Sequence, residues 1–105
     1  MPFDDALAER VRAELAGEPG LTERKMFGGI AWMVGGNLAV GVRGDDLMVR
    51  VGPEGAADAL AQPHARQSYM GEREMKGWIL VGPVDDLAGW VRRGVGYARS
   101  LPAKG

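Results

Sequence analysis

The chain has 105 residues, a formal net charge of -1, 46% hydrophobic residues and no cysteine. This composition is typical of one soluble globular domain and excludes an intrinsically disordered chain, while the lack of cysteine excludes disulfides and thiolate chemistry. The sequence shows no signal peptide and no apolar run near the roughly 20 residues that span a bilayer, so we expect a cytoplasmic protein without a membrane segment.

The first predicted element is an amphipathic helix over residues 3–16. Asp4 and Asp5 lie at its start, where carboxylates cap free amides, and Pro19 follows its end. Apolar side chains recur every four residues along one face of this helix: Phe3, Leu7, Val11 and Leu15.

Residues 26–51 contain three apolar runs separated by two glycine-bearing turns. The second and third runs, residues 37–43 and 47–51, alternate apolar and other side chains, which is typical of half-buried strands. The first run, residues 26–34, is apolar on both faces and is interpreted as one strand, covered on both sides or exposing an apolar strip to a partner. We expect these runs to form an antiparallel meander.

The second half is predicted to hold a short helix over residues 54–62, strands over 67–70 and 76–81, and a helix over 84–101. Gly89, Gly94 and Gly96 each weaken the last helix, which suggests close packing there or marginal stability. The order is α-β-β-β-α-β-β-α. The sequence therefore predicts one α+β domain over residues 1–105, with two layers, an antiparallel sheet of about five strands, helices on one face, and a frayed tail from about residue 102.

Candidate catalytic groups lack partners in the sequence. His64, the one histidine, has no nucleophile or carboxylate motif around it, and Gly28-Gly29 precedes a strand rather than the helix of a phosphate-binding loop. The side chains of adjacent acidic residues, such as Asp45 and Asp46, point in different directions on a strand or a helix, so neither carboxylate has the other as a partner. We therefore expect a non-enzymatic protein with no catalytic, cofactor-binding or metal-binding residues, and no small-molecule substrate.

Two groups of residues favour binding. Residues 66–105 carry seven Lys and Arg against four Asp and Glu, and the apolar first run and the methionines at positions 70 and 75 suit adaptable protein contacts. The alternatives are a solvated helix surface for the basic group and ordinary core packing for the apolar one. The possible interaction surface of the basic third consists of Arg66, Arg73, Lys76, Arg92, Arg93 and Arg99.

Several segments resemble the TfoX amino-terminal domain of the TfoX/Sxy family. They are Met26-Phe27-Gly28-Gly29, the strand pair ending Met48-Val49-Arg50-Val51, Met75-Lys76-Gly77-Trp78, and Tyr97-Ala98-Arg99-Ser100-Leu101. The likeness covers residues 7–101 and implies a stand-alone bacterial domain. The first and third segments carry over as fold-bearing, and the family offers no catalytic residues to carry over.

The resemblance implies a small regulatory or protein-interaction domain, because the family's larger members regulate natural competence as transcriptional co-activators. We expect a protein partner or self-association. The alternative is a nucleic-acid-binding accessory protein that uses the basic carboxy-terminal third, with Tyr69 and Trp78 available for stacking.

Overall fold

The computed structural model describes residues 4–26, 28–70 and 72–102. The elements are α1 (Asp5–Leu15), β1 (Leu21–Met26), β2 (Gly29–Val34), β3 (Asn37–Arg43), β4 (Asp46–Arg50), α2 (Ala56–Leu60), β5 (Ala65–Met70), β6 (Arg73–Val81) and α3 (Leu87–Ser100). No helix in these ranges has both the length and the hydrophobicity needed to span a bilayer.

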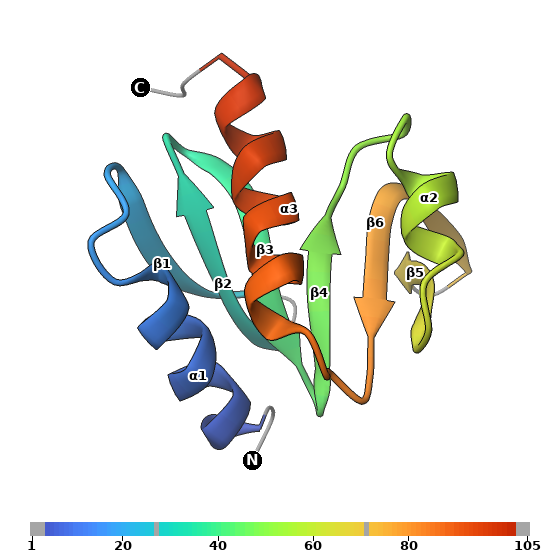
Figure 1. Cartoon of the computed structure of the whole chain (residues 1–105), viewed down its shortest axis with the longest axis horizontal. Coiled ribbons are helices and arrows are strands. Elements are labelled where there is room, and N and C mark those ends of the chain that lie inside the picture. The colour runs from blue at the N-terminus through green and yellow to red at the C-terminus, as the bar shows by residue number, and fades with distance from the viewer. Residues whose placement is uncertain (1–3, 27, 71, 103–105) are drawn as a thin grey trace.

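All strands belong to one antiparallel sheet in the order β1-β2-β3-β4-β6-β5 (Figure 1). The α3 helix crosses β2, β3 and β4, α1 packs beside α3, and α2 contacts β5 and β6. Side chains from all three helices and from the middle strands form one core on the same face of the sheet. The predicted two-layer α+β fold is confirmed, with six strands where about five are expected.

The strand β1 is missing from the sequence prediction, which treats residues 26–34 as one strand. In the structure this run is divided, because Met26 ends β1 and pairs with Gly29, the first residue of β2. The side chains from Thr22 to Lys25 are all exposed, as is common at the charged edge of a sheet. Such a strand shows no apolar alternation, so its sequence does not identify it.

Two helices have carboxylate caps, and the one at the start of α1 is predicted from its sequence. Asp4 accepts hydrogen bonds from the amides of Ala6 and Leu7, and Asp86 accepts one from the amide of Gly89. Phe3, the predicted first residue of the α1 stripe, lies outside the described residues. The central helix is shorter than predicted, since Pro53 and Glu54 lie in a turn before it, and β6 starts three residues earlier than expected.

The glycines of α3 differ in their surroundings. A methyl group on Gly94 would overlap the carbonyl oxygen of Ala39 and a methyl group of Val40, so the absence of a side chain lets the helix lie directly on β3. A methyl group on Gly96 would meet no atom within 4 Å. The predicted close packing is therefore correct for Gly94 and wrong for Gly96.

A polar network joins α1 to the first two strands. The carboxylate of Glu23 accepts hydrogen bonds from Nε of Arg12 and from Nε1 of Trp32, both at 2.8 Å. The hydrogen bond from Arg12 lowers the pKa of Glu23 below its usual range, and Trp32 acts in the same direction. Because Trp32 is a buried core residue, the network connects the edge strand to the core.

The opposite face of the sheet has no helix, yet its centre is buried. Ala31 and Met48 on this face are only 1% and 3% exposed. Nη1 of Arg43 in β3 donates a hydrogen bond of 3.4 Å to the carbonyl oxygen of Tyr69 in β5, although β4 and β6 separate these strands. The sheet therefore curls toward its helix-free face, and β5 lies behind β6 in Figure 1.

We predict opposite effects for alanine at two positions of α3. Gly94→Ala should lower the free energy of unfolding by about 1–3 kcal/mol, because the new methyl group overfills the contact with β3. Gly96→Ala should raise it by about 1 kcal/mol, because alanine has the higher helix propensity and the position is open. Urea unfolding of both variants measures the difference. Equal effects at the two sites would contradict this account of how α3 packs.

The Glu23 network should make stability depend on pH. A glutamate whose pKa is lowered by folding contributes stability that is fully present above its unfolded pKa of about 4.3 and is lost as the pH falls through its folded pKa. The stability difference between the native protein and Glu23→Gln should thus be constant above about pH 4.3 and shrink below it. Urea titrations from pH 3 to pH 7 test this, with Glu14→Gln on the exposed face of α1 as control.

Candidate interaction site

The end of β4 is fixed by Gly77 in β6. The carbonyl oxygen of Gly77 accepts hydrogen bonds from the amides of Val51 and Gly52, at 2.8 and 3.0 Å. Gly77 has a positive φ of 83°, and a methyl group there would lie 2.9 Å from the carbonyl carbon of Gly52. Only glycine satisfies both requirements, so this backbone contact determines where the chain leaves the sheet.

The guanidinium group of Arg50 lies between two aromatic rings. It is 5.3 Å from the ring centre of Trp78 in β6 and 5.4 Å from that of Tyr97 in α3. Both distances are within the range of a cation–π interaction. The ring of Tyr97 also occupies the space where a side chain on Gly52 would lie. Arg50, Trp78 and Tyr97 are called the Arg50 cluster below.

A hollow of about 430 Å³ adjoins the Arg50 cluster. It lies between the carboxyl end of α3 and the segment that connects β4 to α2. Its lining consists of Val51, Pro53, Glu54, Gly55, Tyr97 and Ser100. Pro53, Glu54 and Ser100 are exposed, so the hollow opens to solvent and is accessible to a side chain of another molecule.

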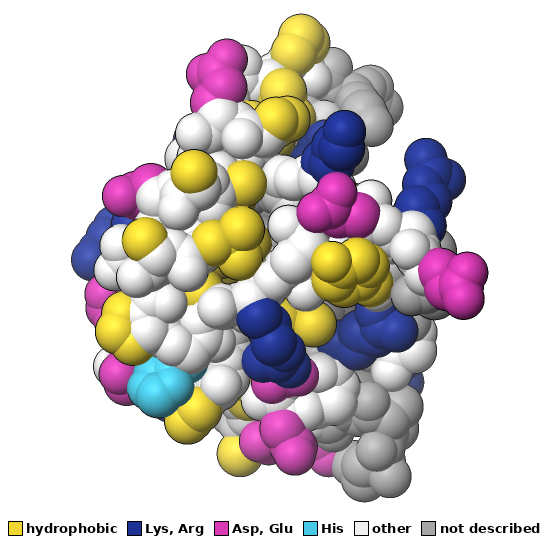
Figure 2. Space-filling model, turned by 90° about the vertical axis from the view of Figure 1, so that its right-hand side faces the viewer, with side chains coloured by type: hydrophobic (Ala, Val, Ile, Leu, Met, Phe, Trp, Pro, Cys, Tyr) yellow, Lys and Arg dark blue, Asp and Glu magenta, His cyan; other side chains and the backbone are white. Residues whose placement is uncertain are grey.

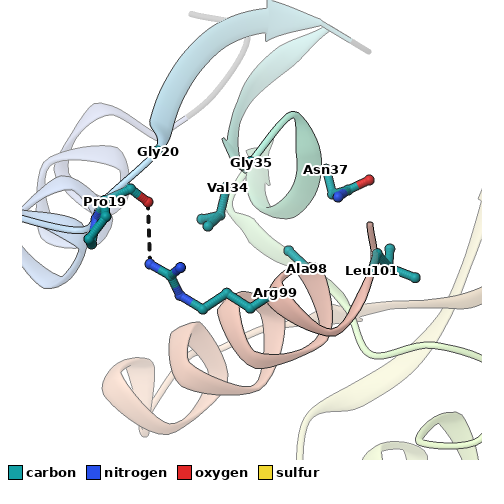
Figure 3. A pocket seen from close by; sticks show the side chains of 8 residues that line it. All are labelled: Pro19, Gly20, Val34, Gly35, Asn37, Ala98, Arg99 and Leu101. Atoms are coloured by element: carbon teal, nitrogen blue, oxygen red, sulfur yellow. Dashed lines mark hydrogen bonds between the residues drawn. The ribbon is translucent and has the colours of Figure 1, made fainter. Parts of the chain in front are cut away.

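Two further hollows flank α3. One of about 310 Å³ lies on the other side of its carboxyl end, where Arg99 donates hydrogen bonds to the carboxylate of Glu18 and to the carbonyl oxygen of Pro19 (Figure 3). The other, of about 230 Å³, lies near the amino end of α3 and is lined by Trp90 and Arg93 among others. In each of these hollows an arginine of the chain itself provides the positive charge.

Comparison with protein-family models identifies one match, to the TfoX N-terminal domain, over residues 13–97. The chain belongs to the TfoX N-terminal domain family. Comparisons with curated proteins and with solved structures find no match.

Three of the four segments that carry the resemblance to the TfoX N-terminal domain meet at the Arg50 cluster. The strand pair contributes Arg50, the Met75–Trp78 segment contributes Gly77 and Trp78, and the last segment contributes Tyr97. The sequence analysis missed the roles of Arg50 and Tyr97, although the alternation in β4 places Arg50 on the face away from the core. The pairing with Tyr97 joins residues that are far apart in the chain, and no local pattern indicates it.

The remaining segment, Met26 to Gly29, includes the last residue of β1 and the first residue of β2 in this TfoX N-terminal domain. Gly28 has a φ of 72°, and a side chain on Gly29 would overlap the carbonyl oxygen of Val42. The backbone of β3 therefore approaches Gly29 so closely that only glycine fits there, while Phe27 lies outside the described residues. In the other segment Lys76 is exposed, and the sulfur of half-buried Met75 accepts a hydrogen bond from Ser68 at 3.7 Å.

The six basic residues of the predicted surface are divided between the two layers. Arg66, Arg73 and Lys76 belong to β5 and β6, and Arg92, Arg93 and Arg99 belong to α3. Three of them are engaged with carboxylates, in the pairs Arg66–Asp46, Arg93–Asp58 and Arg99–Glu18. Figure 2, which faces α2, β5 and β6, shows basic, acidic and hydrophobic side chains interspersed over this side.

The helix-free face carries arginines that the sequence analysis did not group. The strand register aligns one row of residues across all six strands: Arg24, Ala31, Gly41, Met48, Leu80 and Arg66. Residues paired across antiparallel strands share a face, so arginines stand at both ends of an apolar row. Met33 on the same face is half-buried, and the side chain of Met70 lies outside the described part of the chain.

The histidine of the chain, His64, lies near one carboxylate. Nε2 of His64 is 3.9 Å from the nearer carboxylate oxygen of Asp85, and both side chains are largely exposed. Within residues 4–26, 28–70 and 72–102, no three His, Asp or Glu side chains are placed to hold a metal ion. The arrangement at the Arg50 cluster provides shape, aromatic surface and charge, which are the means of binding.

The backbone contact of Gly77 predicts a strong effect of substitution. Gly77→Ala should lower the free energy of unfolding by about 2–4 kcal/mol, because it combines an unfavourable positive φ with an overlap against Gly52. Gly28→Ala is the matched control, since its φ is also positive but a methyl group there would meet no atom within 4 Å. That control should cost only about 1–2 kcal/mol. Thermal unfolding of both variants tests this, and an equal cost would contradict the role assigned to Gly77.

Proposed function

We propose that this domain is a non-enzymatic protein-interaction domain that binds its partner at the Arg50 cluster and the adjoining hollow. The observation that carries the proposal is the convergence of three family segments at the Arg50 cluster, which adjoins an accessible hollow through Tyr97. Residues 50, 78 and 97 come from β4, β6 and α3, and their contacts hold these elements in one arrangement. A site held in this way is preformed, which lowers the entropic cost of association.

The residue types at the site support binding to protein. Tyrosine, tryptophan and arginine are enriched among the residues that dominate the energy of protein interfaces. Tyr97 and Trp78 are half-buried, so each ring is held by the fold and still offers part of its surface to another molecule. The hollow of about 430 Å³ is large enough to admit one or two side chains of a partner.

The placement of the basic residues favours a protein partner over nucleic acid. A nucleic-acid-binding surface needs several cations on one face that are free to contact phosphates. In this domain the basic residues of the carboxy-terminal third occupy both layers, and Arg66, Arg93 and Arg99 already have carboxylate partners.

The biological role that we propose follows the family resemblance. A cytoplasmic bacterial domain of the TfoX type that binds a protein partner would act in regulation, and the resemblance points to transcription and to natural competence. Binding at the Arg50 cluster would bring the domain to its regulatory partner, and no chemical step by the domain itself is required.

A blocked-hollow variant tests this function. Ser100 is exposed at the end of α3 and lines the hollow, so Ser100→Trp should fill it and reduce recovery of the partner in a tagged pull-down at least about tenfold. Ser100→Ala, which leaves the hollow open, should recover the partner as the native protein does. All samples are treated with nuclease, and circular dichroism confirms that the variants fold.

Two outcomes would contradict the proposal. Recovery that disappears with nuclease would indicate a nucleic-acid bridge and favour the basic third of the chain as the binding surface. Equal recovery by the native protein and Ser100→Trp would show that the partner binds elsewhere on the domain.

A further inference from the structure

We propose that the hollow beside Tyr97 receives a basic side chain, lysine or arginine, from the protein partner. This inference rests on the proposed function and adds the chemistry of the group that is bound. It follows from a comparison of the charges around this hollow with those around the two other hollows described above.

Each of the other two hollows contains an arginine of this chain. Arg99 lines one, where Glu18 and the carbonyl oxygen of Pro19 accept its hydrogen bonds, and Arg93 lines the other, where it pairs with Asp58. The hollow beside Tyr97 differs, because none of its described lining residues is basic. The hollow beside Tyr97 therefore has room for a positively charged group from another molecule.

Glu54 supplies the negative charge at the mouth of this hollow. It is exposed in the turn before α2, and it forms no salt bridge with any described residue. Glu18 and Asp58 differ from Glu54, since each is paired with an arginine of α3. Glu54 therefore remains available for an ion pair with a partner.

The carboxyl end of α3 adds a second source of negative potential. The last carbonyl groups of a helix carry partial negative charge because they lack amide partners within the helix. Among the described residues, the hydroxyl of Ser100 donates a hydrogen bond of 2.6 Å to the carbonyl oxygen of Tyr97, and the amide of Leu101 donates one of 3.3 Å to that of Ala98. Arg99, the basic residue of the last turn, extends to the opposite flank and lines the other hollow (Figure 3).

The walls of the hollow match the hydrocarbon part of a long basic side chain. Val51 and Pro53 provide apolar surface on the side of the β4–α2 connection, and the ring of Tyr97 provides it on the side of α3. Lysine and arginine bury their methylene groups on such surfaces while the charged end reaches polar groups. The guanidinium of Arg50 contacts the Tyr97 ring but does not line the hollow.

A titration with short peptides tests the inference. The probes are acetyl-Ala-Lys-Ala-amide and the same peptide with norleucine in place of lysine, which keeps the methylene chain and removes the charge. We expect the lysine peptide to shift the amide NMR signals of Val51, Gly55, Tyr97 and Ser100, and to bind at least about fivefold more tightly than the norleucine peptide.

Glu54→Gln should reduce the affinity for the lysine peptide at least about fivefold and leave the norleucine peptide unaffected. Glu14→Gln, on the exposed face of α1, is the matched control and should change neither. Equal responses to the two peptides, no response to either, or a lysine response that Glu54→Gln does not change would overturn the inference.

The peptide titration and the partner pull-down can fail independently, so a wrong basic side chain can be told apart from a wrong interaction site. If Ser100→Trp abolishes partner recovery while the lysine and norleucine peptides behave alike, the interaction site stands and the basic side chain is wrong. If Ser100→Trp leaves partner recovery unchanged, the interaction site itself is wrong, whatever the peptides do.

Discussion

The direct contact of α3 with β3 is the constraint on which the rest of the structure depends. Gly94 brings the helix axis so close to the strand that a single methyl group would overlap the backbone of Ala39. This distance determines how far Tyr97, one turn later, extends over the end of β4. It also brings the stripe of Leu87, Trp90 and Val91 into the core beside the strands. The position of the hollow beside Tyr97 therefore depends on a residue that has no side chain.

A second glycine contact acts together with the first. Gly77 holds the chain where it leaves β4, so that Gly52 passes beneath the ring of Tyr97. Arg50 then lies between the aromatic side chains of β6 and α3. The contacts made by Gly94, Gly77 and Arg50 each join elements that are distant in sequence. Together they complete the packing of the sheet against the carboxyl end of α3. The hollow is the space that remains where these elements meet the β4–α2 connection.

The sequence was sufficient to predict the fold class and most elements, because their patterns are local. The alternation in β3 and β4, the apolar stripe of α3, and the caps at Asp4 and Asp86 each depend on residues a few positions apart. The strand β1 was missed for the same reason, since its exposed polar residues carry no period-two apolar pattern. Elements with strong local sequence patterns are predicted correctly. An element such as β1, which forms by pairing with a neighbouring strand, is not predicted.

The candidate site was much less predictable. The sequence indicated Trp78 and Gly77 through the resemblance, but the grouping of Arg50 with Tyr97 exists only after β4, β6 and α3 have packed. The basic residues show the opposite relation between sequence and fold. They lie close together in the final third of the sequence, yet the fold assigns them to the sheet and to α3, and carboxylates from elsewhere in the chain, such as Glu18 and Asp58, neutralise several of them.

The two edges of the sheet limit how a partner can approach. At β1 the side chains from Thr22 to Lys25 are exposed and mostly charged, and at β5 the pairing with β6 is interrupted between Gln67 and Tyr69. Both features discourage a foreign strand from adding to a sheet through its main chain. Recognition by this domain is therefore expected to depend on the identity of partner side chains. Under the proposed function, a partner would be selected by its sequence and would differ in this from a generic extended peptide.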